Sequence, residues 1–463
     1  MSVEGARVSA ARALAFATIR ETFESNAFTE RAFRAAADGA GVEGRERAQA
    51  QRLAYGAVQR RGTLNAAIER LAGRSIRLLD PPVLAALRLG LYELLFADGT
   101  PDHAAVDQAV ELAKANGAAH AAGFVNAILR RAGRERAELS AALLECDSTV
   151  AEAAVAHSAP EWLARMWWEE LGPDAARSLL AASNEPAQVA MRVNTLRGER
   201  DALLAKLREG EVDVAPAEGE WPLASPESIV VSGRTGTIVA PLVKAGELTP
   251  QSLGSAAVVE VLDPQAGEHV LDLCAGPGIK TGQIAARMGD RGEVISVELD
   301  PTRAGEVAAQ ADRLGLRTVT VIEADVAAAE GMPSGFDRVL LDAPCSDLGA
   351  LASRPDARWR KSPKTIGRLV EVQQRALLAA AKVLRPGGVL VYATCTISRR
   401  ENEERVEALL AASAAGEVPP LELEDLGARA PALASPQEPR CLQLRPDRDR
   451  TTGFFIARLK RHD

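Results

Sequence analysis

The first 138 residues carry apolar side chains at the spacing of amphipathic helices. Apolar residues recur every three or four positions through Ala11–Ile19 and again through Val83–Leu94, which gives each predicted helix one apolar face. Asp80-Pro81-Pro82 predicts a helix start, with Asp80 as the N-cap acceptor and prolines that have no backbone N–H to lose in the first turn. Because this stretch has no glycine-rich phosphate loop and no cluster of catalytic residue types, it predicts a helical bundle that binds or braces, in preference to a second active site.

From Gly246 onward, short apolar runs alternate with segments of helical length. Helices are predicted at Thr302–Leu314 and Ile366–Leu384. Strands are predicted at His269–Cys274, Glu293–Glu298, Thr318–Glu323, Asp337–Asp342, Val389–Thr394 and Phe454–Leu459. This alternation is typical of an α/β fold with a doubly wound, mainly parallel sheet.

The segment between these two parts has a weaker pattern. Met191–Thr195 predicts a short strand, Asp201–Leu207 a helix and Ile229–Val231 a second strand, and Glu209–Gly236 is read as loops around that strand. We therefore expect a small α+β module. A further stretch, Ala411–Pro439, is rich in alanine, proline and glutamate and predicts an exposed excursion before the last strand.

The pattern as a whole predicts three parts. They are an all-helical domain over residues 1–140, linker helices with the small α+β module over 141–245, and an α/β catalytic domain over 246–463.

Composition narrows the class of protein. Hydrophobic residues make up 47% of the 463 residues, which is enough for several cores. The five cysteines are too few and too scattered for a disulfide framework, and none lies at metal-ligand spacing, so no metal is expected. Charged residues interrupt the first twenty positions, and no apolar run approaches the roughly 20 residues of a membrane span. These features predict a cytoplasmic enzyme with reduced thiols, expected to be a monomer.

The charge is unevenly distributed. The whole chain has a net charge of −8, whereas residues 1–138 hold 19 Lys and Arg against 16 Asp and Glu. The helical part is therefore the more compatible with a polyanion such as RNA. Its densest basic clusters are Arg60-Arg61 and Arg130-Arg131, the latter with Arg134 and Arg136 close by, and a solvated surface would explain them equally well.

A glycine-rich turn follows the first predicted strand of the α/β part. Residues Cys274–Lys280 lie between that strand and the opening of a helix, an arrangement whose backbone N–H groups bind nucleotide-like cofactors. Glu298 ends the next strand, where an acidic side chain can accept from ribose hydroxyls, and Asp325 follows the third strand, where a carboxylate can meet an adenine amino group. Alternatively, the side chains of both acids only cap the ends of their strands.

Two cysteines stand at the ends of later strands. Cys345 follows Asp342-Ala343-Pro344, and Cys395 ends the run from Val389. A lone cysteine after a strand is usually a core residue. Two thiols at strand ends beside a cofactor loop indicate instead nucleophilic chemistry on a molecule held next to the cofactor.

The helical part resembles the RNA-binding fold of the antitermination factor NusB. The resemblance rests on three stretches taken in order, Arg52–Val58, Leu87–Leu94 and Gly123–Arg130.

The α/β part is similar to RNA 5-methylcytosine methyltransferases that use S-adenosylmethionine. The shared signatures are the loop Asp272-Leu273-Cys274-Ala275-Gly276-Pro277-Gly278-Ile279-Lys280, the run Asp342-Ala343-Pro344-Cys345-Ser346, and Thr394-Cys395 followed by Glu401-Asn402-Glu403. With the helical part attached, the chain resembles the members of this family that act on bacterial 16S ribosomal RNA. The resemblance implies a Rossmann-like catalytic domain preceded by an all-α RNA-binding domain and the small α+β module.

The family pattern also implies a role for each site residue. Cys395 would be the nucleophile that adds to carbon 6 of cytosine, Cys345 would assist release, and Asp342 would line the pocket shared by the base and the cofactor. S-adenosylmethionine would be held by Cys274, Ala275, Gly276, Pro277, Gly278, Ile279 and Lys280, with Glu298, Asp325 and Asp342. Lys280 is one candidate for assisting ionisation of the Cys395 thiol, and a structural lysine at a helix start is the other reading.

Four positions depart from the family pattern. Ile279 and Asp347 replace small residues, and Ser252 and Thr452 stand where aspartate is common. The leading hypothesis is methylation of 16S ribosomal RNA at carbon 5 of a cytosine, as a part of ribosome biogenesis. The alternatives are methylation of a transfer RNA cytosine and a non-catalytic RNA-binding factor on a decayed methyltransferase fold.

Overall fold

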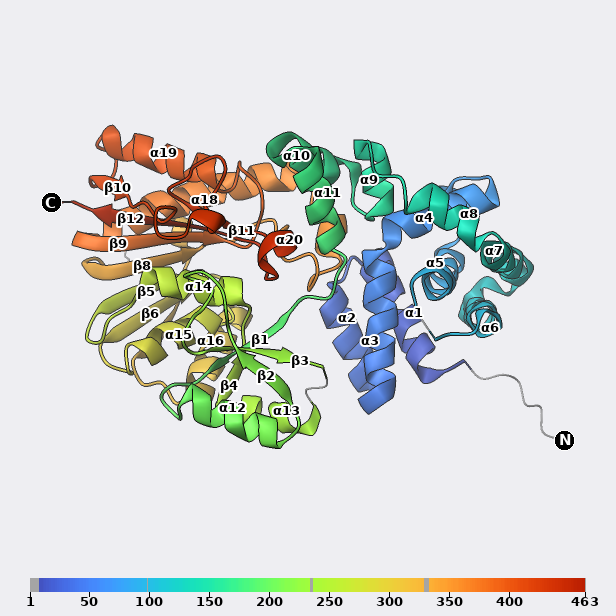
Figure 1. Cartoon of the computed structure of the whole chain (residues 1–463), viewed down its shortest axis with the longest axis horizontal. Helices are drawn as coiled ribbons and strands as arrows, with labels where there is room; N and C mark the ends of the chain where they lie inside the picture. Colours follow the sequence, from blue (N-terminus) through green and yellow to red (C-terminus); the bar gives the residue numbers. More distant parts are fainter. Residues whose placement is uncertain (1–7, 98, 234–235, 329–332, 463) are drawn as a thin grey trace. The chain divides into compact units, whose positions relative to one another are not determined.

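The chain folds into two compact units. The computed structural model describes residues 8–97, 99–233, 236–328 and 333–462. A helical unit consists of residues 1–185 with 351–360, and an α/β unit consists of residues 186–350 with 361–463 (Figure 1).

The helical unit is built from short helices. They are α1 (Ala10–Glu24), α2 (Thr29–Ala40), α3 (Gly44–Gln59), α4 (Arg61–Ala72), α5 (Pro81–Phe96), α6 (Asp102–Ala113), α7 (Ala122–Arg134), α8 (Arg136–Leu143), α9 (Val150–Ala156), α10 (Glu161–Leu171) and α11 (Pro173–Ala182), with the short turns η1 (Ile76–Leu78), η2 (Lys114–Ala118) and η3 (Ala119–Ala121). The helices from α1 to α8 contribute to one apolar core, and the periodic residues Leu14, Ile19, Leu87 and Leu91 are buried in it, as the helical spacing predicts. Asp80 does precede α5, but its side chain makes no capping hydrogen bond to the helix. Its carboxylate lies 3.2 Å from His120 Nε2 instead, so the predicted N-cap acceptor is wrong.

A short segment distant in sequence completes the helical unit. Residues 351–360, which include α17 (Ala357–Arg360), contact α3, α4 and the residues that follow α9 and α11. The Arg358 guanidinium, 1% exposed, donates to the backbone oxygens of Ser158 at 3.0 Å and Ser183 at 2.8 Å. The Trp359 indole N–H donates to the backbone oxygen of Val58 at 2.8 Å. Along the sequence this segment lies within the predicted α/β domain, and the sequence pattern did not predict that it packs in the helical unit.

The α/β unit is centred on an eight-stranded mixed sheet. Its strands are β5 (His269–Leu273), β6 (Glu293–Glu298), β7 (Val319–Glu323), β8 (Phe336–Asp342), β9 (Leu384–Thr394), β10 (Leu421–Leu423), β11 (Leu442–Leu444) and β12 (Phe454–Arg461). The order is β10-β12-β9-β8-β5-β6-β7, with β11 pairing β12; β9, β8, β5, β6 and β7 run parallel, and β12 is antiparallel to β9. The six predicted strands are all present, and the predicted α/β fold is confirmed.

Helices cover both faces of this sheet, which explains its apolar strands. One core lies beneath α14 (Leu253–Leu262), α15 (Ile279–Arg287) and α16 (Pro301–Leu314), and the other beneath α18 (Pro363–Val383) and α19 (Glu403–Ala414) (Figure 1). The helix α20 (Pro446–Asp449) and the turns η4 (Val326–Ala328) and η5 (Pro431–Leu433) complete the unit.

The small module is a four-stranded antiparallel sheet within the same unit. Its strands β1 (Val189–Val193), β2 (Asp213–Pro216), β3 (Ser228–Ser232) and β4 (Leu248–Pro250) are ordered β2-β3-β1-β4, with helices α12 (Arg200–Glu209) and α13 (Gly236–Lys244). The loops predicted over residues 209–236 therefore contain the strand β2, which is short, lies at the sheet edge and ends at a proline, so it carries little alternation.

The prediction that Ala411–Pro439 forms an exposed segment is wrong. This stretch contains β10 and η5, and Leu426, Ala430 and Leu433 are buried in the core beneath α14. Their irregular spacing among prolines gives no helical or strand period, so only packing onto the sheet reveals them. Among the described residues, no helix is both long enough and apolar enough to cross a membrane.

Candidate active site

The site forms where the sheet order changes direction. β5 is flanked by β6 on one side and by β8 on the other, and ligands of such sheets bind outside the carboxyl ends of the strands at this point. The glycine-rich loop follows β5, Asp342 ends β8, and Cys395 follows β9. The register pairs Asp342 with Ala393, so the loops that carry the two cysteines leave adjacent strands at the same level.

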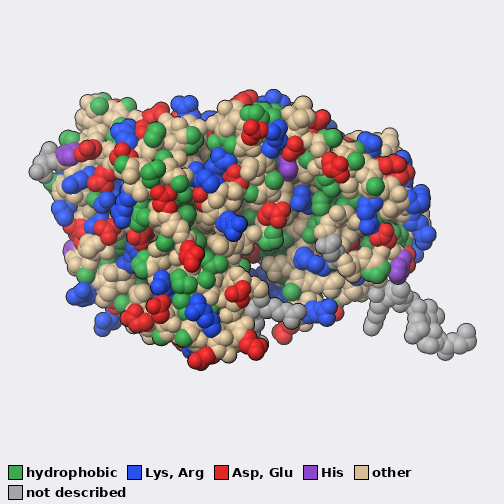
Figure 2. All heavy atoms as spheres, viewed as in Figure 1, with side chains coloured by type: hydrophobic (Ala, Val, Ile, Leu, Met, Phe, Trp, Pro, Cys, Tyr) green, Lys and Arg blue, Asp and Glu red, His purple; other side chains and the backbone are tan. Residues whose placement is uncertain are grey.

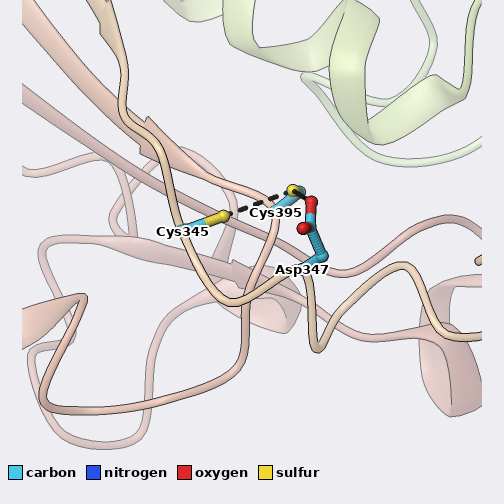
Figure 3. A group of neighbouring side chains, drawn as sticks. All are labelled: Cys345, Asp347 and Cys395. Atoms are coloured by element: carbon cyan, nitrogen blue, oxygen red, sulfur yellow. Dashed lines mark hydrogen bonds between the residues drawn. The ribbon is translucent and has the colours of Figure 1, made fainter. Parts of the chain in front are cut away.

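The two predicted thiols are in contact. Cys345 Sγ lies 3.3 Å from Cys395 Sγ (Figure 3). Cys345 is buried, whereas Cys395 is partly exposed. The hydrogen bond with Cys395, together with burial, holds the pKa of Cys345 well above its usual range. Cys345 is therefore a protonated thiol at neutral pH, and Cys395 is the more accessible sulfur.

Backbone and side-chain hydrogen bonds fix the loop after β8 against the end of β9. The backbone N–H of Ala343 donates to Ala393 O, and that of Gly349 donates to Cys395 O, each at 2.9 Å. The buried Glu401 carboxylate accepts from the backbone N–H of Ser346 at 2.9 Å. Burial raises the pKa of Glu401. Its position within one signature was noted from the sequence, but its structural role as the acceptor that holds the Cys345 loop was missed.

Lys280 pairs with Asp342, at the end of β8. Its ammonium donates to Asp342 Oδ2 at 2.6 Å and lies 5.0 Å from the centre of the Phe454 ring. The lysine side chain is 10% exposed and the aspartate 28%. The carboxylate that contacts Cys395 is that of Asp347, which had been noted only as a departure from the family pattern. The pairing of Lys280 with Asp342 argues against Lys280 as the group that assists Cys395.

The glycine-rich loop is a close-packed turn. Gly278 has φ +91°, and a Cβ there would meet Val307 Cα at 3.0 Å; a Cβ at Gly276 would meet Glu298 Oε2 at 2.6 Å. The left-handed backbone and the nearby Val307 backbone favour glycine at position 278, and a side chain at position 276 would displace the Glu298 or Arg303 side chain. Ile279 follows as the first residue of α15 and is half-buried. Cys274, at the start of the loop, is half-buried, and burial raises its thiol pKa.

The two acids predicted to bind a cofactor lie in different surroundings. Glu298 is buried, and its carboxylate accepts from the backbone N–H groups of Gly276 at 2.9 Å, Leu299 at 3.0 Å and Asp300 at 3.2 Å. Asp325 is exposed and accepts from the backbone N–H of Ala327 at 2.9 Å. Glu298 thus joins the glycine loop to the end of β6, whereas Asp325 has the hydrogen bond expected of a local turn.

A buried carboxyl beneath the loop has unused hydrogen-bonding capacity. Asp272, in β5, is fully buried; one oxygen accepts from Thr281 Oγ1 at 2.6 Å, and the other has no hydrogen-bond partner among the described residues. Burial raises its pKa from 3.8 to about 7. The glycine turn, its acidic neighbour Glu298 and this orphaned oxygen fit a nucleoside cofactor with several hydrogen-bond donors.

Asp272→Asn is expected to stabilise the protein increasingly as pH rises. The raised pKa means that the unfolded carboxyl ionises from about pH 4 upward while the folded one stays protonated to about pH 7, so the wild-type protein loses stability across that window. The variant should gain up to about 4 kcal/mol relative to wild type by pH 8. Urea denaturation without cofactor at several pH values measures the difference, with the exposed Asp312→Asn as control; a difference that is constant with pH would contradict it.

The thiol pair has a third potential metal ligand beside it. One ligand atom each from Cys345, Asp347 and Cys395 lies within 4.8 Å of the others, a donor set that a thiophilic ion could use. The Lys361 ammonium, 3.4 Å from Asp347 Oδ2, opposes a cation at this place.

Three regions of the chain match known protein families. Residues 259–460 match the 16S rRNA methyltransferase RsmB/F family, residues 6–134 the NusB family, and residues 159–231 the ferredoxin-like domain of RsmF/B-like methyltransferases. The matches to the first two families agree with the two resemblances noted in the sequence.

Several relatives are similar over most of the chain. The probable ribosomal RNA small subunit methyltransferase B of Synechocystis is 33% identical, covering 97% of this chain and 99% of that protein. The corresponding Bacillus subtilis protein is also 33% identical, covering 88% and 89%. The crystal structure of PH0851 is similar over 100% of both chains, with a TM-score of 0.80 and 25% identity.

Proposed function

The chain belongs to the RsmB/F family of ribosomal RNA methyltransferases, and from this membership we propose that it methylates carbon 5 of a cytosine in 16S ribosomal RNA. The methyl donor in this proposal is S-adenosylmethionine, and the reaction passes through a covalent adduct between a cysteine and carbon 6. The observation that carries it is the pair of thiols 3.3 Å apart at the ends of β8 and β9, beside the glycine loop after β5.

Two thiols suit this chemistry because carbon 5 of cytosine is a poor nucleophile. Addition of the Cys395 sulfur at carbon 6 makes carbon 5 electron-rich, and the adduct must afterwards lose the carbon 5 proton and expel the enzyme. Cys395 is the more exposed thiol and is assigned the addition. Cys345 keeps its proton and is assigned to the release step. Asp342, paired with Lys280, is assigned to the ring nitrogen, where a shared proton offsets the charge that develops.

The loop of residues 274–280 and the acids Glu298 and Asp325 are proposed to hold the cofactor. When bound, S-adenosylmethionine supplies an electrophilic methyl group on a sulfonium. The loop offers backbone donors at the amino end of α15, and Asp272 offers an unsatisfied acceptor below it. The intact set of Cys345, Cys395 and Asp342 supports an enzyme over a decayed fold.

Methylation assays with defined RNA transcripts test the proposed function. Purified protein, radiolabelled S-adenosylmethionine and equal amounts of 16S ribosomal RNA or a transfer RNA pool are incubated, and the RNA is digested to nucleosides. We expect labelled 5-methylcytidine in the 16S digest alone. Label in another nucleoside would refute the cytosine chemistry, and label in the transfer RNA digest alone would refute the substrate.

Glu298→Ala is expected to weaken binding of S-adenosylmethionine. The substitution removes an acceptor for the ribose hydroxyls and the hydrogen bond from the Gly276 N–H that holds the loop, so the loss should be roughly 1.5–3 kcal/mol. Calorimetric titration measures it, with Glu293→Ala at the opposite end of β6 as the matched control. An unchanged dissociation constant would leave Glu298 as a strand-end cap without a role in cofactor binding.

The arginines of α7 are the better candidates for RNA contact. Arg60 and Arg61 lie over the rings of Phe96 and Phe23, 4.7 and 4.6 Å from the ring centres, so they serve packing. Arg130 and Arg134 are exposed on α7. Figure 2 shows basic and acidic side chains interspersed over the face in view, so local clusters have to supply the attraction.

Replacing Arg130 and Arg134 together by alanine should therefore weaken RNA binding and flatten its salt dependence. Each lost phosphate contact lowers the slope of log affinity against log salt by roughly 0.7–0.9. Titration of an RNA fragment at several salt concentrations measures both quantities, with the double variant Arg34→Ala and Arg45→Ala as control. Unchanged affinity and slope would mean that this face of α7 does not contact RNA.

A further inference from the structure

Asp347 is the carboxylate in contact with the nucleophile. Cys395 Sγ donates to Asp347 Oδ1 at 3.3 Å (Figure 3). The second oxygen of Asp347 lies 3.4 Å from Lys361 Nζ, which also donates to the backbone oxygen of Cys345 at 3.2 Å. Thiol, carboxylate and ammonium thus form a continuous line, with both charged side chains about one-fifth exposed.

The backbone holds this carboxylate in place. Asp347 has φ +59°. This left-handed conformation is uncommon outside glycine, and such residues cluster at functional sites. Its backbone oxygen accepts from the N–H of Ala350 at 3.0 Å, and the neighbouring Gly349 N–H donates to the backbone oxygen of Cys395 itself. The turn that carries the carboxylate is therefore fastened to the residue that carries the thiol.

A carboxylate in contact with a thiol can act on it during the reaction. Asp347 Oδ1 lies within hydrogen-bond distance of the Cys395 sulfur. The same carboxylate can accept the thiol proton while sulfur forms its bond to carbon, which is general base catalysis. Lys361 offsets the charge of Asp347 before the reaction and restricts its rotation.

Resting on the proposed function, we propose that Asp347 is a catalytic residue, the general base that deprotonates Cys395 during addition to the pyrimidine ring. In this step the S–H bond breaks and its proton moves to Asp347 Oδ1. The sulfur electron pair forms the bond to carbon 6, and the π pair between carbons 5 and 6 moves to carbon 5. During release, water takes the proton on carbon 5, and the electron pair of that C–H bond re-forms the π bond between carbons 5 and 6. The pair of the carbon 6–sulfur bond returns to sulfur, to which the Cys345 thiol donates a hydrogen bond, and the proton on Asp347 then returns to that sulfur.

Asp347→Asn separates this role from a purely electrostatic or structural one. Asparagine keeps the size and the hydrogen bond but cannot take the proton. The first readout is the rate at which iodoacetamide alkylates Cys395 at fixed pH, followed by peptide mass spectrometry. The second is the single-turnover rate of methyl transfer to 16S ribosomal RNA. Asp347→Glu tests rescue, and the exposed Asp312→Asn is the control.

We expect alkylation of Cys395 in Asp347→Asn to be as fast as in wild type or faster, because a repelling charge has gone. Methyl transfer should fall about 100-fold, the low end for a lost general base, and Asp347→Glu should recover part of it. Methyl transfer at the wild-type rate would overturn the proposal, and a parallel fall in both readouts would show a structural role instead. Wild-type protein that forms no 5-methylcytidine would refute the proposed function itself.

Discussion

Replacing Cys395 by alanine is expected to abolish methyl transfer while leaving the affinity for S-adenosylmethionine nearly unchanged. The proposed reaction needs a sulfur at carbon 6, and alanine offers no nucleophile, so no adduct forms. The glycine-rich loop that is proposed to hold the cofactor lies after β5 and does not depend on this thiol for its turn. Single-turnover assays and calorimetric titration measure the two quantities, and residual transfer within tenfold of wild type would contradict the assignment.

Replacing Cys345 by alanine should instead accumulate a covalent protein–RNA complex. Burial and the contact with Cys395 keep its thiol protonated, which suits a group that assists the departure of the other sulfur. Without it, addition and methylation proceed while elimination slows. Denaturing gels with labelled RNA detect the complex. If Cys395→Ala accumulated the adduct and Cys345→Ala formed none, the two roles would be exchanged.

Replacing Arg358 by alanine is expected to destabilise the helical unit by about 3 kcal/mol or more. The guanidinium is 1% exposed and satisfies the backbone oxygens of Ser158 and Ser183 and the Asn184 side chain, at distances from 2.8 to 3.0 Å. Each buried acceptor left without a donor costs about 1–3 kcal/mol, and alanine also leaves a cavity.

Chemical denaturation measures the loss at Arg358, with the exposed Arg354→Ala in the same segment as control. A loss below 1 kcal/mol would show that water replaces the guanidinium.

The packing of residues 351–360 in the helical unit also affects how RNA binding by this unit can be tested by truncation. Removing the first 138 residues would take away Val58, which accepts from the Trp359 indole, and the helix α4 that packs against α9. Point substitutions on α7 are therefore the cleaner test of RNA binding.

The periodicity of apolar residues along the chain was sufficient to predict the main helices and strands. Strand and helix patterns are local. β5, β6 and β8 were each predicted to within one residue, because both faces of this sheet are covered and its strands are continuously apolar. β9 begins at Leu384, ahead of the predicted Val389. The predictions were wrong or missing where apolar residues do not recur at a regular spacing. These places are the edge strand β2, the core residues among the prolines before β11, and the segment 351–360 that packs in the helical unit.

The candidate site divides in the same way. The sequence by itself determined that two cysteines, an aspartate and a glycine loop end parallel strands, and parallel strands bring their carboxyl ends to one edge of a sheet. Only the tertiary structure decided which groups touch. The register of β8 against β9 brings Cys345 to Cys395, and the left-handed backbone at Asp347 turns its carboxylate onto the same sulfur. It also pairs Lys280 with Asp342. Asp347 and Cys395 are 48 positions apart, and contacts over such separations depend on strand register and turn geometry, which leave no periodic trace in the chain.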